Sequence, residues 1–128
     1  MNAVDELTAY LSECCLKYLL DACAVVDAQG LVLRSAGVFI EDAALSQVPV
    51  WVDAAHKMSA AMQVLPLSYV CLAAVGQRKH ALAWRVSVGD TLVYVVVSLG
   101  ALPRNMSVIQ HHLSRDIAFL VPQDEVKA

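Results

Sequence analysis

The chain has 128 residues, the usual size of one domain, which excludes a catalytic domain joined to a separate regulatory domain. Hydrophobic residues make up 59% and charged residues 16%, where about 25% charged is ordinary, so disorder is excluded and a second buried surface is expected, as in an oligomer or a partner-binding protein. The net charge of −3 comes without any basic stripe, which argues against nucleic-acid binding.

The N-terminus and the cysteines indicate the compartment. The first residues, Met1 to Glu6, lack the positive region of a secretory signal. The cysteines show no C-x-x-C spacing and are interpreted as reduced thiols that pack like small hydrophobic residues, with Cys23 and Cys71 buried in strands. We therefore expect a cytoplasmic protein.

The spacing of apolar residues changes twice in the first half of the chain. Apolar residues recur every three or four positions from Val4 onward, which predicts a helix over 3–20. The turn at Asp27 to Gly30 lies between two apolar runs and predicts a hairpin of two strands, 22–27 and 31–36.

Helical spacing returns over 41–65, where Pro49 leaves two alternatives. Either a short piece around 42–47 precedes a main helix over 49–64, or one helix is kinked at the proline. We prefer the first. The core side of this helix is expected to hold Leu45, Val48, Val52, Ala55, either Met58 or Ser59, and Met62.

The uncharged stretch 58–77 is just long enough to span a bilayer. Pro66 interrupts it and its period changes there, so a helix end followed by a strand is expected, with no membrane span.

The second half predicts three strands and a helix. The strands are 68–75, 80–86 and 92–97. The last of these lacks alternation, which is typical of a central strand covered on both faces. A final amphipathic helix begins near Met106 and ends before Pro122, and either Asn105 or Ser107 caps it.

These elements predict an α/β (α+β) fold in a single domain, 1–121, with a C-terminal tail, 122–128. The order is α-β-β-α-β-β-β-α, with a five-stranded antiparallel sheet and helices on both faces. Segments 24–33 (AVVDAQGLVL) and 89–93 (GDTLV), with the closing helix from Asn105, resemble the roadblock/dynein light-chain family, which includes bacterial regulators of small Ras-like GTPases.

The resemblance implies a non-catalytic homodimer, built by the second helices and the strand after them, whose partner GTPase performs the chemistry. The residues of the second helix are consistent with this dimer. Trp51 lies at the margin of the helix face that is expected to pack on the core, beside a second face of small residues. The candidate dimer or partner interface comprises Trp51, Ala54, Met58, Ala61, Tyr69, Cys71 and Ala73.

The sequence holds no motif of catalysis or of cofactor binding, whether G-x-S-x-G, a Walker loop or G-x-G-x-x-G. His112 and Asp116 share a helix face and could hold half a metal site; we prefer a solvated pair. We expect no catalytic residues, cofactor or metal. Two alternatives remain: a PAS- or profilin-like small-molecule sensor, and a small acidic secretion chaperone, which would place three strands before the middle helix and two after.

Overall fold

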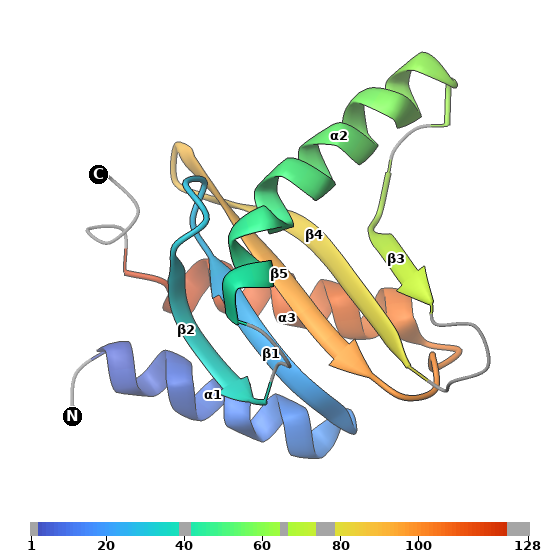
Figure 1. The fold of residues 1–128 in the computed structure, drawn as a ribbon. Coiled ribbons are helices and arrows are strands. Elements are labelled where there is room, and N and C mark those ends of the chain that lie inside the picture. The colour runs from blue at the N-terminus through green and yellow to red at the C-terminus, as the bar shows by residue number, and fades with distance from the viewer. Residues whose placement is uncertain (1–2, 39–41, 65–66, 74–78, 123–128) are drawn as a thin grey trace.

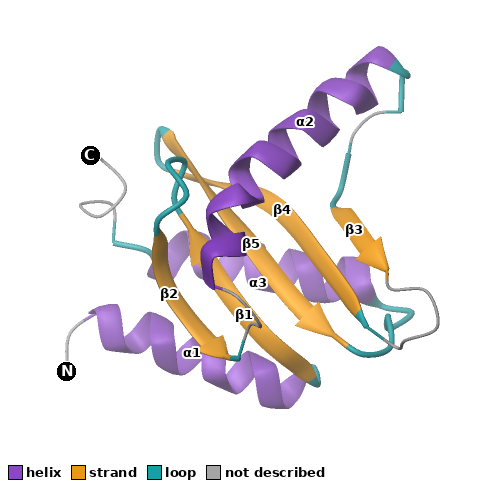
Figure 2. Cartoon of the chain, viewed as in Figure 1, coloured by secondary structure: helices purple, strands orange, loops and turns teal. Residues whose placement is uncertain are grey.

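The computed structural model describes residues 3–38, 42–64, 67–73 and 79–122. The elements in chain order are α1 (Ala3–Lys17), β1 (Leu20–Val26), β2 (Val32–Gly37), a short 3-10 helix η1 (Asp42–Gln47), α2 (Val48–Ala61), β3 (Val70–Ala73), β4 (His80–Val88), β5 (Thr91–Leu99) and α3 (Met106–Leu120). Figure 2 colours them by type. The predicted order α-β-β-α-β-β-β-α is confirmed.

The strands form one five-stranded antiparallel sheet in the order β2-β1-β5-β4-β3. β5 is central, as its unbroken apolar run predicted, and β3 lies at an edge. α1 and α3 cover one face of the sheet, while α2 lies on the other (Figure 1). Both the sheet and its two covered faces are therefore confirmed.

The larger half of the core lies between the sheet and the pair α1 and α3. Leu7 and Leu11 of α1 and Leu113 and Ile117 of α3 are fully buried in it. Trp84 of β4 faces this layer, and its Nε1 donates a hydrogen bond to Oγ of Ser114 at 2.9 Å. The alternation of β4 predicted this arrangement, with Leu82, Trp84 and Val86 on this face.

The α2 face has a smaller core of small and β-branched side chains. Val48 and Val52 of α2 pack there on Ala24, Ala83 and Val96 of the sheet. Only the first half of α2 lies over the strands, because its second half extends past the sheet edge (Figure 1).

The expected core side of α2 is therefore only partly right in its second half. Met62 is 66% exposed and Met58 is 65% exposed, and Ala55 is only half-buried. Of the two alternatives Met58 and Ser59, Ser59 is the buried one, and its Oγ donates a hydrogen bond to the carbonyl of Val64. The helical period was right, but no sheet lies beneath the end of this helix.

Several boundaries differ from the predictions. α1 ends at Lys17 because Leu19 takes a left-handed φ of 57°, which turns the chain into β1. Pro49 lies in the first turn of α2, where its missing N–H costs nothing, so the preferred alternative of a short piece before the helix is confirmed. Asn105 occupies the N-cap position of α3, through its carbonyl and not its side chain.

Some predictions fall on residues outside the description. The predicted strand 68–75 is seen as β3, and residues 74 and 75 lie outside the described part. So does the expected tail from residue 123 onward. Within the described residues, no helix is long and apolar enough to cross a membrane.

Candidate interaction site

An open groove of about 670 Å³ lies between the first half of α2 and the strands β3 and β4. Its walls are almost entirely apolar. Its largest apolar lining side chains are Val38, Leu45, Val48, Trp51, Leu72 and Val96. Polar groups are confined to a few residues, including Lys79 and His80, so the groove suits an apolar occupant.

The sequence builds this groove by placing small residues beneath it. Ala81 of β4 lines its floor, where a larger side chain would have filled the space, and Ala73 borders the groove at the end of β3. Residues of η1 form part of another wall, and the β1–β2 turn packs against η1 from behind. Gly30 of that turn has φ +90°, and a Cβ there would lie 2.7 Å from the carbonyl oxygen of Ser46 in η1. Glycine thus lets the turn and η1 approach closely.

Exposed apolar side chains extend the groove along the end of α2. Met58 and Met62 follow Trp51 by about two and about three helical turns, which places all three on one side of the helix. Leu72 of β3 is 60% exposed beside the groove. We call the groove, with Trp51, Met58, Met62 and Leu72, the α2–β3 surface. Exposed apolar surfaces of this kind are typical of interaction sites.

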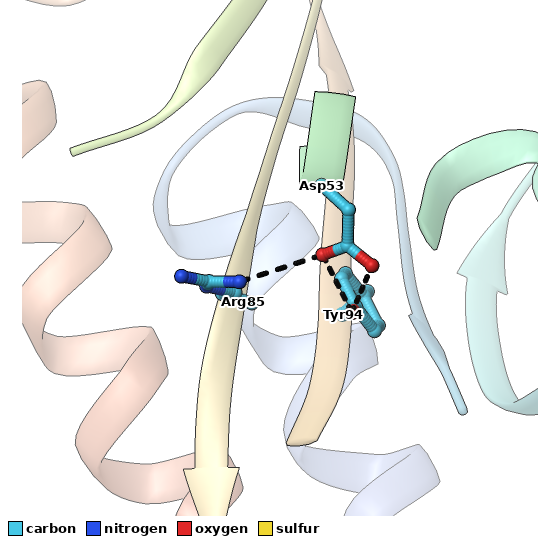
Figure 3. A network of polar contacts seen from close by, with 3 residues as sticks. All are labelled: Asp53, Arg85 and Tyr94. Atoms are coloured by element: carbon cyan, nitrogen blue, oxygen red, sulfur yellow. Dashed lines mark hydrogen bonds and ion pairs between the residues drawn. The ribbon is translucent and has the colours of Figure 1, made fainter. Parts of the chain in front are cut away.

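A polar cluster lies on the opposite side of α2. The Tyr94 hydroxyl donates to Asp53, with distances of 2.8 Å to Oδ1 and 3.0 Å to Oδ2 (Figure 3). Nη1 of Arg85 lies 3.5 Å from Oδ1 of the same carboxylate. Burial, reinforced by the bond to Asp53, raises the pKa of Tyr94 to about 12, so the hydroxyl remains a donor at neutral pH. Burial, followed by the charge of Arg85, lowers the pKa of His56.

The α2 residues of the predicted interface are all accessible. Ala54, Met58 and Ala61 are exposed, and half-buried Trp51 lines the groove. Ala73 of β3 also lines it.

The structure places two other predicted residues on the far face of the sheet. Tyr69 packs against the α1–α3 core, and Cys71 is paired with Leu82, whose side chain belongs to that core. The β3 side chains that share the α2 face are Val70 and Leu72, which the sequence analysis missed. The pairings of Val70 with Ala83 and of Leu72 with Ala81 identify this face, because alternation alone allows either choice.

The expected burial of Cys71 is wrong. The residue is exposed, because it lies on an edge strand with a neighbouring strand on one side only among the described residues. Cys14 and Cys23 are buried and Cys15 is half-buried, and all four cysteines are free. Burial raises the pKa of Cys23 well above its ordinary value, which makes it a poor nucleophile.

The pair His112 and Asp116 forms no metal site with other described groups, since no described cluster of three His, Cys, Asp or Glu residues could hold an ion. The Tyr10 hydroxyl donates instead to Oδ2 of Asp116 at 2.7 Å, and Nε of Arg115 lies 3.1 Å from its Oδ1. The hydrogen bond between Tyr10 and Asp116 connects α1 to α3.

Solved structures share this fold. MglB from Myxococcus xanthus is 15% identical, with a TM-score of 0.66, over 95% of this chain and 95% of its own. A structure described as MglB with tetrameric arrangement is 12% identical, with a TM-score of 0.70, over 94% and 90%. A roadblock/LC7 domain from Streptomyces avermitilis is 10% identical, with a TM-score of 0.55, over 77% and 82%.

No protein-family model matches the chain, and no curated protein matches it at a significant level. The structural likeness concerns the fold. The roadblock resemblance drawn from segments 24–33 and 89–93 is confirmed at that level.

Proposed function

We propose that this chain is a non-catalytic homodimeric module that regulates, or serves as an adaptor for, a small Ras-like GTPase in the cytoplasm. The single observation that carries the proposal is the α2–β3 surface, an apolar groove beside an edge strand on a domain with few charges. The shared fold with MglB and roadblock domains supports the choice of partner, and one of those structures is described as tetrameric.

The dimer would use the edge of β3 that faces away from β4. Among the described strands β3 pairs with β4 alone, so a second β3 could pair with its other side, antiparallel across a two-fold axis, and satisfy the amides and carbonyls there. The two α2 helices would then meet over the joined sheet. Met58 and Met62 of one copy would cover the groove of the other, where Trp51 and Leu72 lie. This arrangement removes the exposed apolar surface from water.

Two measurements test the proposal. Sedimentation velocity should show a dimer at about 10 µM, a concentration suited to a stable interface. Ras-like GTPases of the same cell, loaded with GDP or with a non-hydrolysable GTP analogue, should then bind the dimer with different affinities. The chain alone with GTP should release no phosphate. Absence of binding in both nucleotide states, or hydrolysis by the chain alone, would contradict the proposal.

The groove also favours a second candidate, a small-molecule sensor, since its volume falls in the range of ligand pockets. Such sites carry a few convergent polar groups, whereas the lining here is nearly all apolar. A small apolar ligand that binds the chain without competing with dimer formation would support the sensor. The secretion-chaperone hypothesis required three strands before the middle helix and two after, and the order found is the reverse.

A further inference from the structure

Helix α2 consists of an anchored half and a projecting half. Val48 and Val52 in the first half are buried against the sheet. Beyond them, Met58 and Ala61 are exposed while Ser59 is buried, and none of the described strands lies beneath this part of the helix (Figure 1). Apart from Ser59, the half that carries the exposed methionines therefore has no buried side chain to hold its direction.

The bond between Tyr94 and Asp53 lies where the two halves meet. Asp53 directly follows Val52, the last buried apolar side chain of α2. Tyr94 belongs to the central strand and is 2% exposed, so its ring is held firmly, and its hydroxyl contacts both carboxylate oxygens (Figure 3). A hydrogen bond to a carboxylate is among the stronger ones in proteins. The ion pair with Arg85 is half-exposed and contributes little.

Because this bond lies in the middle of α2, a small change of helix direction there displaces the end of the helix by a larger distance. The end of α2 at Ala61 lies about 12 Å beyond Asp53 along the helix axis, at about 1.5 Å per residue. A tilt of about 10° at Asp53 would displace that end by about 2 Å, whereas packed interfaces require side chains to be held within about 0.5 Å.

We infer that Tyr94 is a positioning residue for dimer formation: its hydrogen bond to Asp53 sets the direction in which the projecting half leaves the sheet, and so brings Met58 and Met62 onto the partner. This inference rests on the proposed homodimer. Tyr94 itself lies beneath α2 and acts through Asp53.

Four single variants separate this role from simple stabilisation. Tyr94→Phe keeps the buried ring and removes only the hydroxyl, and Asp53→Ala removes the acceptor. Asp53→Asn retains an oxygen that accepts the hydrogen bond while losing the charge paired with Arg85. Tyr10→Phe is the matched control, since it removes a tyrosine–aspartate hydrogen bond of 2.7 Å between α1 and α3, on the opposite face.

The readout is the dimer dissociation constant by sedimentation, beside the melting temperature. Tyr94→Phe and Asp53→Ala should each raise the dissociation constant about tenfold or more, whereas Asp53→Asn and Tyr10→Phe should stay within about threefold of wild type. The melting temperatures of Tyr94→Phe and Tyr10→Phe should fall by similar amounts. A Tyr94→Phe protein that dimerises like wild type would overturn the inference and leave the proposed homodimer intact.

A second readout keeps the inference testable apart from the dimer. A monomeric wild type would remove the proposed function, and the inference would then be decided by the angle between α2 and the sheet, measured from residual dipolar couplings. Tyr94→Phe should change that angle or broaden its distribution, while Tyr10→Phe should not. An unchanged angle in Tyr94→Phe would overturn the inference.

Discussion

Placing a carboxylate on the α2–β3 surface should abolish the dimer without unfolding the protomer. Ala54 and Ala60 are both exposed on α2, so a glutamate at either position should change the free energy of unfolding of the protomer by no more than about 0.5 kcal/mol. In the proposed dimer, Ala54 lies beside Trp51 and Met58, where Ala54→Glu would bury an unpaired charge in each copy. Even about 3 kcal/mol of such a penalty raises the dissociation constant more than about 100-fold.

The control for this prediction lies on the same helix. Ala60 follows Asp53 by about two helical turns and therefore shares its side of α2, away from the groove. Sedimentation velocity over about 1 to 100 µM, with thermal denaturation of each variant, should give a monomeric Ala54→Glu and a dimeric Ala60→Glu. Ala61→Glu, one residue on, should behave like Ala54→Glu. If Ala54→Glu dimerises as tightly as wild type and melts at the same temperature, the proposed interface is wrong.

Three further predictions concern the stability of the fold. Val52→Ala should lower the free energy of unfolding by about 2 to 3 kcal/mol in urea titrations, because the side chain is 1% exposed and its loss leaves a cavity under α2; a change below about 0.5 kcal/mol would contradict this packing. Gly30→Ala should destabilise the protein by about 1 to 3 kcal/mol, since φ is +90° and the new Cβ would meet Ser46, and denaturation will show whether it does. Burial is the largest single effect on Asp116 and favours its neutral form, but the hydrogen bonds from Tyr10 and Arg115 and the charge of Arg115 together outweigh it, and the pKa of Asp116 falls below its usual value. As the pH falls, the carboxylate is therefore protonated first in the unfolded chain. The stability that it contributes at neutral pH should be lost as the pH falls through its lowered pKa in the folded protein. The melting temperature of Asp116→Asn should accordingly fall less steeply with decreasing pH than that of the wild type.

The locally encoded features of this fold were predictable from the sequence. The run 92–97 has no polar alternation, and a strand of that kind is stable only where both of its faces are covered, which places it at the centre of the sheet. Pro49 can start a helix but cannot continue one, so the break between η1 and α2 follows from its missing N–H. The turn at Asp27 and Gly30 is equally local: Oδ1 of Asp27 accepts hydrogen bonds from the amides of Gln29 and Leu31.

The composition of the chain also indicated a second apolar surface, but not its place. Period alone does not reveal how far a sheet extends beneath a helix. Met62 continues the apolar stripe of α2 and would be buried if another strand lay below it. Because α2 crosses the edge of the sheet, the same residue becomes part of the exposed α2–β3 surface.

Only the tertiary structure decided which residues face each other across the site. Alternation in β3 leaves two choices of face, and the pairing of Leu72 with Ala81 selects Val70 and Leu72 for the α2 side. Tyr94 and Asp53 are 41 residues apart, and their hydrogen bond exists because β5 passes beneath the middle of α2. Turns, helix starts and strand centres depend on neighbours in the chain, whereas faces and long-range contacts depend on register and on the crossing of layers, which no local pattern encodes.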